Sequence, residues 1–189
     1  MAALPGETAK ALYGTYRFAR FDPDAMDYFR NTNGAFWRSF KAALYIAPFY
    51  AALLLMRYSM GEVSSPMGRF IVVEALAYII AWLAFPVIVE PLTKSMGRGD
   101  RFVRYIIAYN WAAVLQNLLY MPLAMLSVSG ALPPGGAGLM GFVVLLMIMT
   151  YTWFITRTAL QISGSRALGL VALDFALSFL INGYAEKML

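Results

Sequence analysis

Polar side chains inside long apolar runs are the residues of this sequence whose types could do chemistry. Asp174 is the clearest case, because it lies near the middle of an apolar run. If the run crosses a membrane, a carboxylate there costs about 2.5–3.5 kcal/mol, so Asp174 must face protein or water. It would then bind a proton or a cation, anchor a substrate, or form a structural hydrogen bond to a polar group of the apolar run at 102–126. The structural hydrogen bond is the preferred interpretation, with Gln116 and Asn117 as natural partners.

Three amide side chains form a second group within one apolar run. Asn110 and Asn117 are seven residues apart and share a helix face, with Gln116 slightly off that face. Together with Tyr109 and Trp111 they could line a small polar cavity. The preferred alternative is that the amides hold neighbouring helices together by hydrogen bonds.

Two glutamates lie near the ends of a further apolar run. Glu74 is expected at a solvated interfacial position, although pairing with another helix is an alternative. Glu90 and Lys94 are four residues apart in the order that favours an ion pair, while Pro91 disfavours a continuous helix between them. The candidate intramembrane polar site therefore consists of Asp174, Asn110, Gln116, Asn117 and Glu74.

Signatures of enzymes and cofactor sites do not occur in the sequence. It has no Cys and no His, which excludes disulfides, thiolate chemistry and imidazole ligation. We find no phosphate-binding loop, nucleotide-binding glycine fingerprint or nucleophile elbow. Asp22, Asp24 and Asp27 do not have the spacing of a calcium-binding loop, and helix capping plus a solvated face explains them better. We therefore expect a non-enzyme with no cofactor and no metal.

The composition indicates which solvent surrounds these residues. Apolar residues make up 61% of the 189-residue chain and charged residues only 13%, about half the usual share of a soluble domain. A surface with so little charge suits lipid rather than water. The sequence therefore predicts an all-α, polytopic membrane helix bundle.

Apolar length divides the chain into two regions. Residues 1–34 form a predicted cytoplasmic or interfacial segment, in which Ala9, Leu12, Tyr13 and Tyr16 make one face of an amphipathic helix over 8–21. A short second helix over 23–30 starts with Asp22 as N-cap and ends at residues 31–34. Residues 35–189 form the predicted transmembrane domain. Its five spans are expected at about 35–58, 70–90, 102–126, 139–157 and 167–184, separated by loops that include 91–100 and 127–138.

Basic residues predict the orientation of these spans. With five spans, twelve of the fifteen Lys and Arg residues fall on the side of the N-terminus. Arg57, Arg69 and Lys187 fall on the other side. Loops rich in Lys and Arg stay in the cytoplasm, so we expect a cytoplasmic N-terminus and a periplasmic C-terminus in a bacterial inner membrane.

Two short stretches carry a resemblance to a known family. The tripeptide FDP at 21–23, followed by AFWRSF at 35–40 before five closely spaced spans, resembles the Yip-type membrane proteins. The stretch RYIIAYNW at 104–111 is similar to a segment of bacterial members, which are labelled as candidate transporters. The resemblance implies a five-helix bundle with a cytoplasmic N-terminus. Eukaryotic members bind small membrane-traffic GTPases, which is not carried over because the N-terminal segment here is short and basic. The family brings no catalytic residues.

Two functions remain in view. The first is a non-enzymatic membrane scaffold or accessory protein of Yip-like type, acting through lipids and a membrane-protein partner or a second copy of itself. The alternative is a small-solute or ion permease or channel with a polar path around Asp174 and the third span. Scattered basic residues argue against nucleic acid as a partner. A permease predicts Asp174 and the third-span amides around one open cavity, whereas a scaffold predicts them buried in mutual hydrogen bonds.

Overall fold

Helices account for nearly all of the chain in the computed structural model, which describes residues 6–189. Residues 1–5 of the predicted 1–34 segment lie outside the described residues. Between residues 6 and 189 there is no strand. The elements in chain order are α1 (Glu7–Ala19), η1 (Pro23–Tyr28), α2 (Asn33–Ser39), α3 (Lys41–Ser59), α4 (Met67–Ser95), η2 (Gly99–Arg101), α5 (Phe102–Val128), α6 (Pro134–Leu160) and α7 (Gly164–Lys187).

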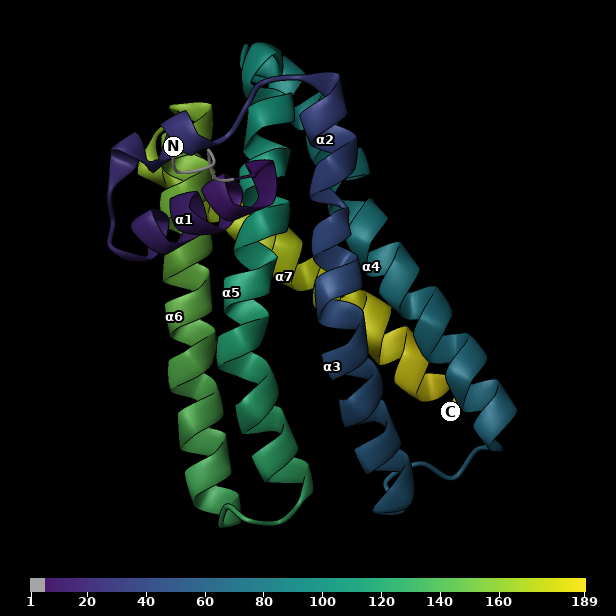
Figure 1. Cartoon of the computed structure of the whole chain (residues 1–189). Coiled ribbons are helices and arrows are strands. Elements are labelled where there is room, and N and C mark those ends of the chain that lie inside the picture. Colours follow the sequence, from purple (N-terminus) through teal and green to yellow (C-terminus); the bar gives the residue numbers. More distant parts are fainter. Residues whose placement is uncertain (1–5) are drawn as a thin grey trace.

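Five helical segments are long and apolar enough to cross a membrane, and each contains one predicted span. They are Asn33–Ser59, Met67–Ser95, Gly99–Val128, Gly135–Leu160 and Gly164–Lys187. An odd number of such segments sends the two ends of the chain to opposite ends of the bundle (Figure 1). The all-helical class and the five apolar helices are thereby confirmed.

The boundaries of the helices differ from the predicted ones. The loop expected at 91–100 is wrong for its first half, because α4 continues through Pro91 to Ser95. A proline inside a helix removes one backbone hydrogen bond, and here the chain tolerates that loss. Lys94 Nζ lies 2.7 Å from Glu90 Oε1 as a result. The loop expected at 127–138 is shorter than predicted, because Pro134 occupies the first turn of α6.

The first long segment is interrupted at Phe40, which separates α2 from α3, whereas Pro48 lies inside α3 without ending it. The expectation that residues 31–34 only terminate a helix is also wrong. Thr32 is the N-cap of α2, and its side chain accepts a hydrogen bond from the backbone N–H of Ala35.

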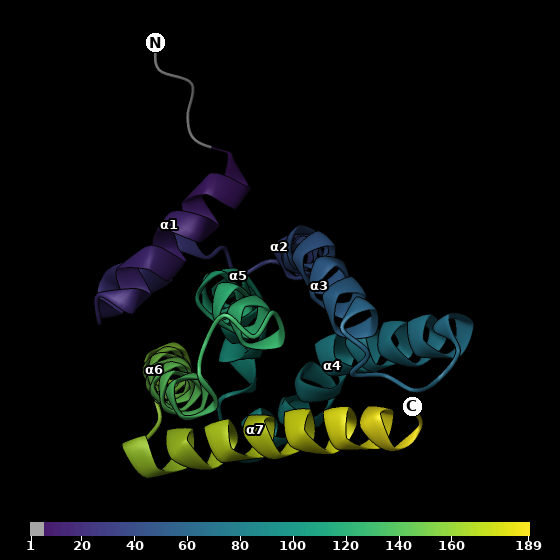
Figure 2. The same ribbon diagram turned by 90° about the horizontal axis from the view of Figure 1, so that it is seen from below.

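Helix α5 occupies the interior of the bundle. It contacts α1, α2, α3 and α6, and Figure 2 shows it surrounded by these helices and α7. Its first half is the main core, where Tyr105, Ile106 and Ala108 are completely buried. Helix α7 crosses the bundle obliquely and contacts α4 and α6 (Figure 1). Residues of the other four long segments are thereby brought next to the second half of α5.

The predicted amphipathic helix forms as α1, which lies across α5 and α6 (Figure 1). It has two apolar faces. Ala11, Thr15 and Phe18 are buried against the bundle, and the hydroxyl of Tyr151 donates to the carbonyl of Thr15 at 2.9 Å. The predicted stripe, which includes Tyr13 and Tyr16, is the other face and is exposed.

The turn after α1 folds back onto that helix. Asp22 caps η1 as predicted, because its side chain accepts a hydrogen bond from the N–H of Asp24. Arg104 of α5 holds the C-terminal end of η1 by donating hydrogen bonds to the carbonyls of Met26 and Phe29. Tyr28 and Phe29 then rest on Gly14, which explains why a glycine stands inside α1.

The close approach at Gly14 gives a first prediction. A methyl group at Gly14 would lie 2.8 Å from side-chain atoms of both Tyr28 and Phe29, so Gly14→Ala must displace η1 from α1. We expect a lower melting temperature in detergent and faster amide exchange over residues 7–30. Gly169→Ala in α7 is the control, since nothing lies within 4 Å of its added methyl group. Equal exchange in the wild type and Gly14→Ala would contradict this packing.

Candidate functional site

A cavity of about 460 Å³ lies between the long helices, and α3, α4, α5, α6 and α7 all contribute to its lining. It surrounds the second half of α5 and opens toward Ser178 and Asn182 of α7, which are exposed. The lining contains no Lys or Arg among the described residues. Its polar members are Tyr50, Tyr78, Tyr109, Gln116, Asn117, Tyr120, Thr152, Asp174, Ser178 and Asn182.

Asp174 reaches this cavity from α7, where it is partly buried. The hydroxyl of Tyr109 donates to its Oδ1 at 2.7 Å. The expected hydrogen bond to a polar group of the third span is therefore confirmed, but the expected partners are wrong, because neither Gln116 nor Asn117 hydrogen-bonds to the carboxyl group. Tyr109 takes that place because the ring stacks on Phe85, with centroids 4.6 Å apart, and directs the hydroxyl toward α7.

The two amides nevertheless line the same cavity as Asp174, as a polar path would require. Gln116 Nε2 donates to Thr152 Oγ1 of α6 at 2.9 Å. Asn117 Nδ2 donates to the carbonyl of Ala113, one turn earlier in its own helix, at 2.8 Å. Both amide nitrogens are therefore engaged with the protein.

Asn110 and Trp111 do not line this cavity. Asn110 is fully buried, and its Nδ2 donates to Ser39 Oγ at 2.9 Å. The reason is the interruption at Phe40, which lets α2 pack on the first half of α5 and cover this face. Asn110 therefore links two helices, which agrees with the preferred interpretation of the amides for this residue.

Glu74 is buried, with a relative exposure of 4%, so the expected solvated position is wrong. Tyr50 donates to its Oε2 at 2.7 Å, and Arg57 Nη1 lies 3.4 Å from its Oε1. Arg57 also pairs with Glu62 and Glu186, at 3.3 and 2.5 Å. A basic residue near the end of α3 thus gives Glu74 a positive partner, which Glu74 shares with Glu62 and Glu186, and connects α4 to the C-terminal end of α7.

Several lining residues were not predicted. Ser178 and Asn182 follow Asp174 at intervals of four, so they lie on the same face of α7, and this spacing could have found them. Tyr50 and Tyr78 are stacked with ring centroids 5.0 Å apart, and Trp82 lies 6.2 Å from Tyr78. Tyr78 and Trp82 are also four residues apart, but aromatic side chains do not stand out in helices that are apolar on every face.

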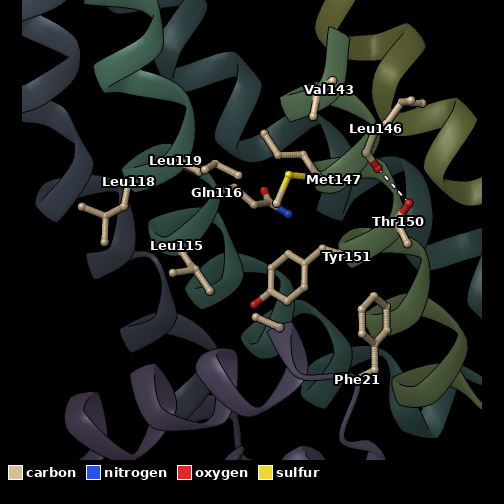
Figure 3. Close-up of a pocket in the computed structure, with 12 residues that line it drawn as sticks. Phe21, Leu115, Gln116, Leu118, Leu119, Val143, Leu146, Met147, Thr150 and Tyr151 are labelled. Carbon is tan, nitrogen blue, oxygen red and sulfur yellow. Dashed lines mark hydrogen bonds between the residues drawn. The ribbon is translucent and has the colours of Figure 1, made fainter. Parts of the chain in front are cut away.

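A second hollow is an apolar groove of about 640 Å³ between α5 and α6, shown in Figure 3. Leu115, Leu119 and Met147 lie along it, and Phe21 and Tyr151 stand near α1 at one end. Gln116 and Ile148 line both this groove and the central cavity. The two hollows are therefore separated by a single layer of side chains.

The acidic residues of the described chain do not assemble a metal site. No group of three or more acidic side chains within residues 6–189 has the geometry to hold an ion. Asp22 pairs with Arg17 and caps η1, and Asp27 lies 3.2 Å from Arg104.

The burial of Glu74 beside Arg57 gives a second prediction. Arg57→Met leaves Glu74 buried beside one neutral donor, and we expect a loss of about 1–3 kcal/mol in unfolding free energy. Adding Glu74→Gln should restore part of that loss, because the uncompensated charge is then gone. Chemical denaturation in mixed micelles measures both variants. Equal stability of Arg57→Met and the wild type would show that Glu74 does not depend on this guanidinium group.

Comparisons of the chain with protein-family models, with curated proteins and with solved structures give no match. The Yip-type resemblance therefore stays a prediction, and the candidate site depends on its own geometry.

Proposed function

We propose that the protein is a multi-pass membrane protein that passes a small solute through the cavity around Asp174. The observation that supports this is the placement of Asp174, Gln116 and Asn117 around one open cavity lined by five helices. The scaffold predicts mutual hydrogen bonds between Asp174 and these amides, and these are not formed, although Asp174 accepts one interhelical hydrogen bond, from Tyr109. The permease or channel is accordingly preferred to the scaffold.

The surface of the bundle supports insertion in a lipid bilayer. Large apolar side chains are exposed along the long helices, among them Phe49, Val87, Leu139 and Phe179. Exposed apolar area of this extent needs a membrane or a partner to cover it. We place the protein in the bacterial inner membrane, with the N-terminus in the cytoplasm, on the basis of the distribution of Lys and Arg.

A scaffold or accessory protein of Yip-like type is the second candidate. It is favoured by the exposed face of α1, where Leu12, Tyr13 and Tyr16 stand free beside Lys10. Such a face suits lipid headgroups or the cytoplasmic surface of a membrane-protein partner, including a second copy of this chain. The two candidates are separated by whether the cavity is open to water in the assembled protein.

Cysteine labelling tests for an aqueous path, because the chain has no cysteine of its own. Ser178→Cys should react with a membrane-impermeant thiosulfonate reagent, since Ser178 lines the open cavity and thiolates form readily only near water. The matched control is Phe179→Cys, the next residue on α7, whose side chain is 69% exposed on the apolar surface and does not line the cavity. We expect reaction at least about tenfold faster for Ser178→Cys.

The converse labelling result would contradict the path. Equal, slow reaction at both positions in vesicles, together with a stoichiometric partner that copurifies without crosslinker, would support the scaffold instead. Adding Asn182→Cys guards against a local effect at Ser178, because it lines the same cavity one turn further along α7.

The proposed orientation makes a separate prediction. A reporter that is active only in the periplasm should be active when fused after Leu189. The same reporter should be silent when it is inserted in the turn at 96–98, between α4 and η2. This follows from the excess of Lys and Arg at the N-terminal end of the bundle. The reverse pattern would overturn the cytoplasmic N-terminus.

A further inference from the structure

We infer that the ligand of the central cavity is an organic cation that carries an apolar group, such as an aromatic or alkyl ammonium. The inference deepens the proposed function by naming a ligand class, and its transport aspect rests on that function. The ligand class is argued from the charge, the polar groups and the aromatic rings of the cavity, and from the groove beside it.

Charge is the first step of the argument. Asp174 is the one carboxyl group in the lining of the cavity, and no Lys or Arg of the described residues shares that lining. Glu74, by contrast, has Arg57 beside it. An ionised carboxylate in apolar surroundings needs a positive partner, and between residues 6 and 189 the protein does not provide one for Asp174. A cationic ligand would supply it.

The polar groups of the lining point in the same direction, because several of their donors are already used within the protein. Tyr109 donates to Asp174, Tyr50 to Glu74, and Tyr78 to the carbonyl of Ala43 at 2.7 Å. The amide nitrogens of Gln116 and Asn117 are engaged as well. Besides the second hydrogen of each amide, these groups still offer carboxyl, amide and hydroxyl oxygens, whose negative charge or partial charge attracts a cation.

Aromatic walls favour an organic cation over an inorganic ion. The Tyr50–Tyr78 stack and the neighbouring Trp82 bring three electron-rich rings to the cavity. Ring faces attract ammonium groups, most strongly when the group is desolvated. A hard metal ion instead requires several oxygen ligands within about 2.6 Å of one point. The polar groups here are spread over five helices around about 460 Å³.

The apolar part of the ligand has a matching place in the adjoining groove. Figure 3 shows Gln116 and Met147 between the flanking leucines, with Thr150 at the edge of the groove. Gln116 and Ile148 line both hollows and stand between them, so a ligand with its charge near Asp174 reaches the groove with its apolar group only where this wall opens. The Gln116–Thr152 hydrogen bond joins α5 to α6 at this wall, so opening it would connect cavity and groove.

The test is equilibrium binding of benzyltrimethylammonium to the full chain in lipid nanodiscs. We expect saturable binding that weakens at least about tenfold in Asp174→Asn, through loss of the Coulombic attraction between the carboxylate and the ammonium group. Glu90→Gln is the control, because it removes an exposed carboxylate that does not line the cavity. Tetramethylammonium should bind more weakly, and the uncharged isostere neopentylbenzene should not compete. Tyr78→Leu keeps Asp174 and should weaken binding about 3- to 30-fold.

The inference is overturned if neopentylbenzene competes equally, or if Asp174→Asn binds like the wild type while circular dichroism shows it folded. Displacement of benzyltrimethylammonium by millimolar sodium, potassium or magnesium chloride at constant ionic strength would also overturn it, in favour of an inorganic ion.

Proteoliposome flux separates the two proposals. Binding without flux would overturn the permease and support the ligand class. Flux of uncharged solutes or inorganic ions without benzyltrimethylammonium binding would support the permease and overturn the ligand class.

Discussion

The tight packing of the first half of α5 is the constraint on which the rest of the structure depends. Between Tyr105 and Ala112 nearly every side chain is buried in the main core, where α1, α2 and α6 pack closely on α5. Beyond Ala112 most side chains of α5 are partly or fully exposed, with Met121 and Leu123 as exceptions, since the surrounding helices diverge (Figure 1). The central cavity exists because one half of the bundle is closed and the other half is not.

Glu74 and Asp174 differ in whether the protein supplies a positive charge beside the carboxyl group. Glu74 is surrounded by Arg57 and Tyr50, which explains how a carboxylate is held at an almost inaccessible position. Asp174 has a hydroxyl group beside it and an open cavity in front of it. Polar residues inside an apolar bundle cost free energy, so a carboxylate without a protein counter-charge is the more informative of the two.

The sequence was sufficient for those features that follow from the chain's local pattern. Long apolar runs allowed the five helices to be predicted, and Asp22 and Pro23 allowed the start of η1 to be predicted. The break at Phe40 was not predictable, because it depends on how α2 meets α5. The passage of α4 through Pro91 was missed for a similar reason, since the helix propensity of a single residue yields to its surroundings.

The candidate site was predictable only in part. Asp174, Gln116 and Asn117 were identified from their polarity in apolar runs, and they do share one cavity. Asn110 and Glu74 were grouped with them by the same criterion, yet Ser39 and Arg57 engage them elsewhere. These partners lie 71 and 17 residues away along the chain, so no local pattern could reveal the pairing.

The contact between α1 and α6 also has a consequence for biosynthesis. Thr15 and Tyr151, which share a hydrogen bond, are 136 residues apart. At typical synthesis rates, roughly 7–27 s separate the appearance of these two residues at the ribosome. The contact of α1 with α6 can therefore form only after most of the bundle has been made. During that interval Phe18 of α1 lacks Phe154, the aromatic partner that α6 supplies.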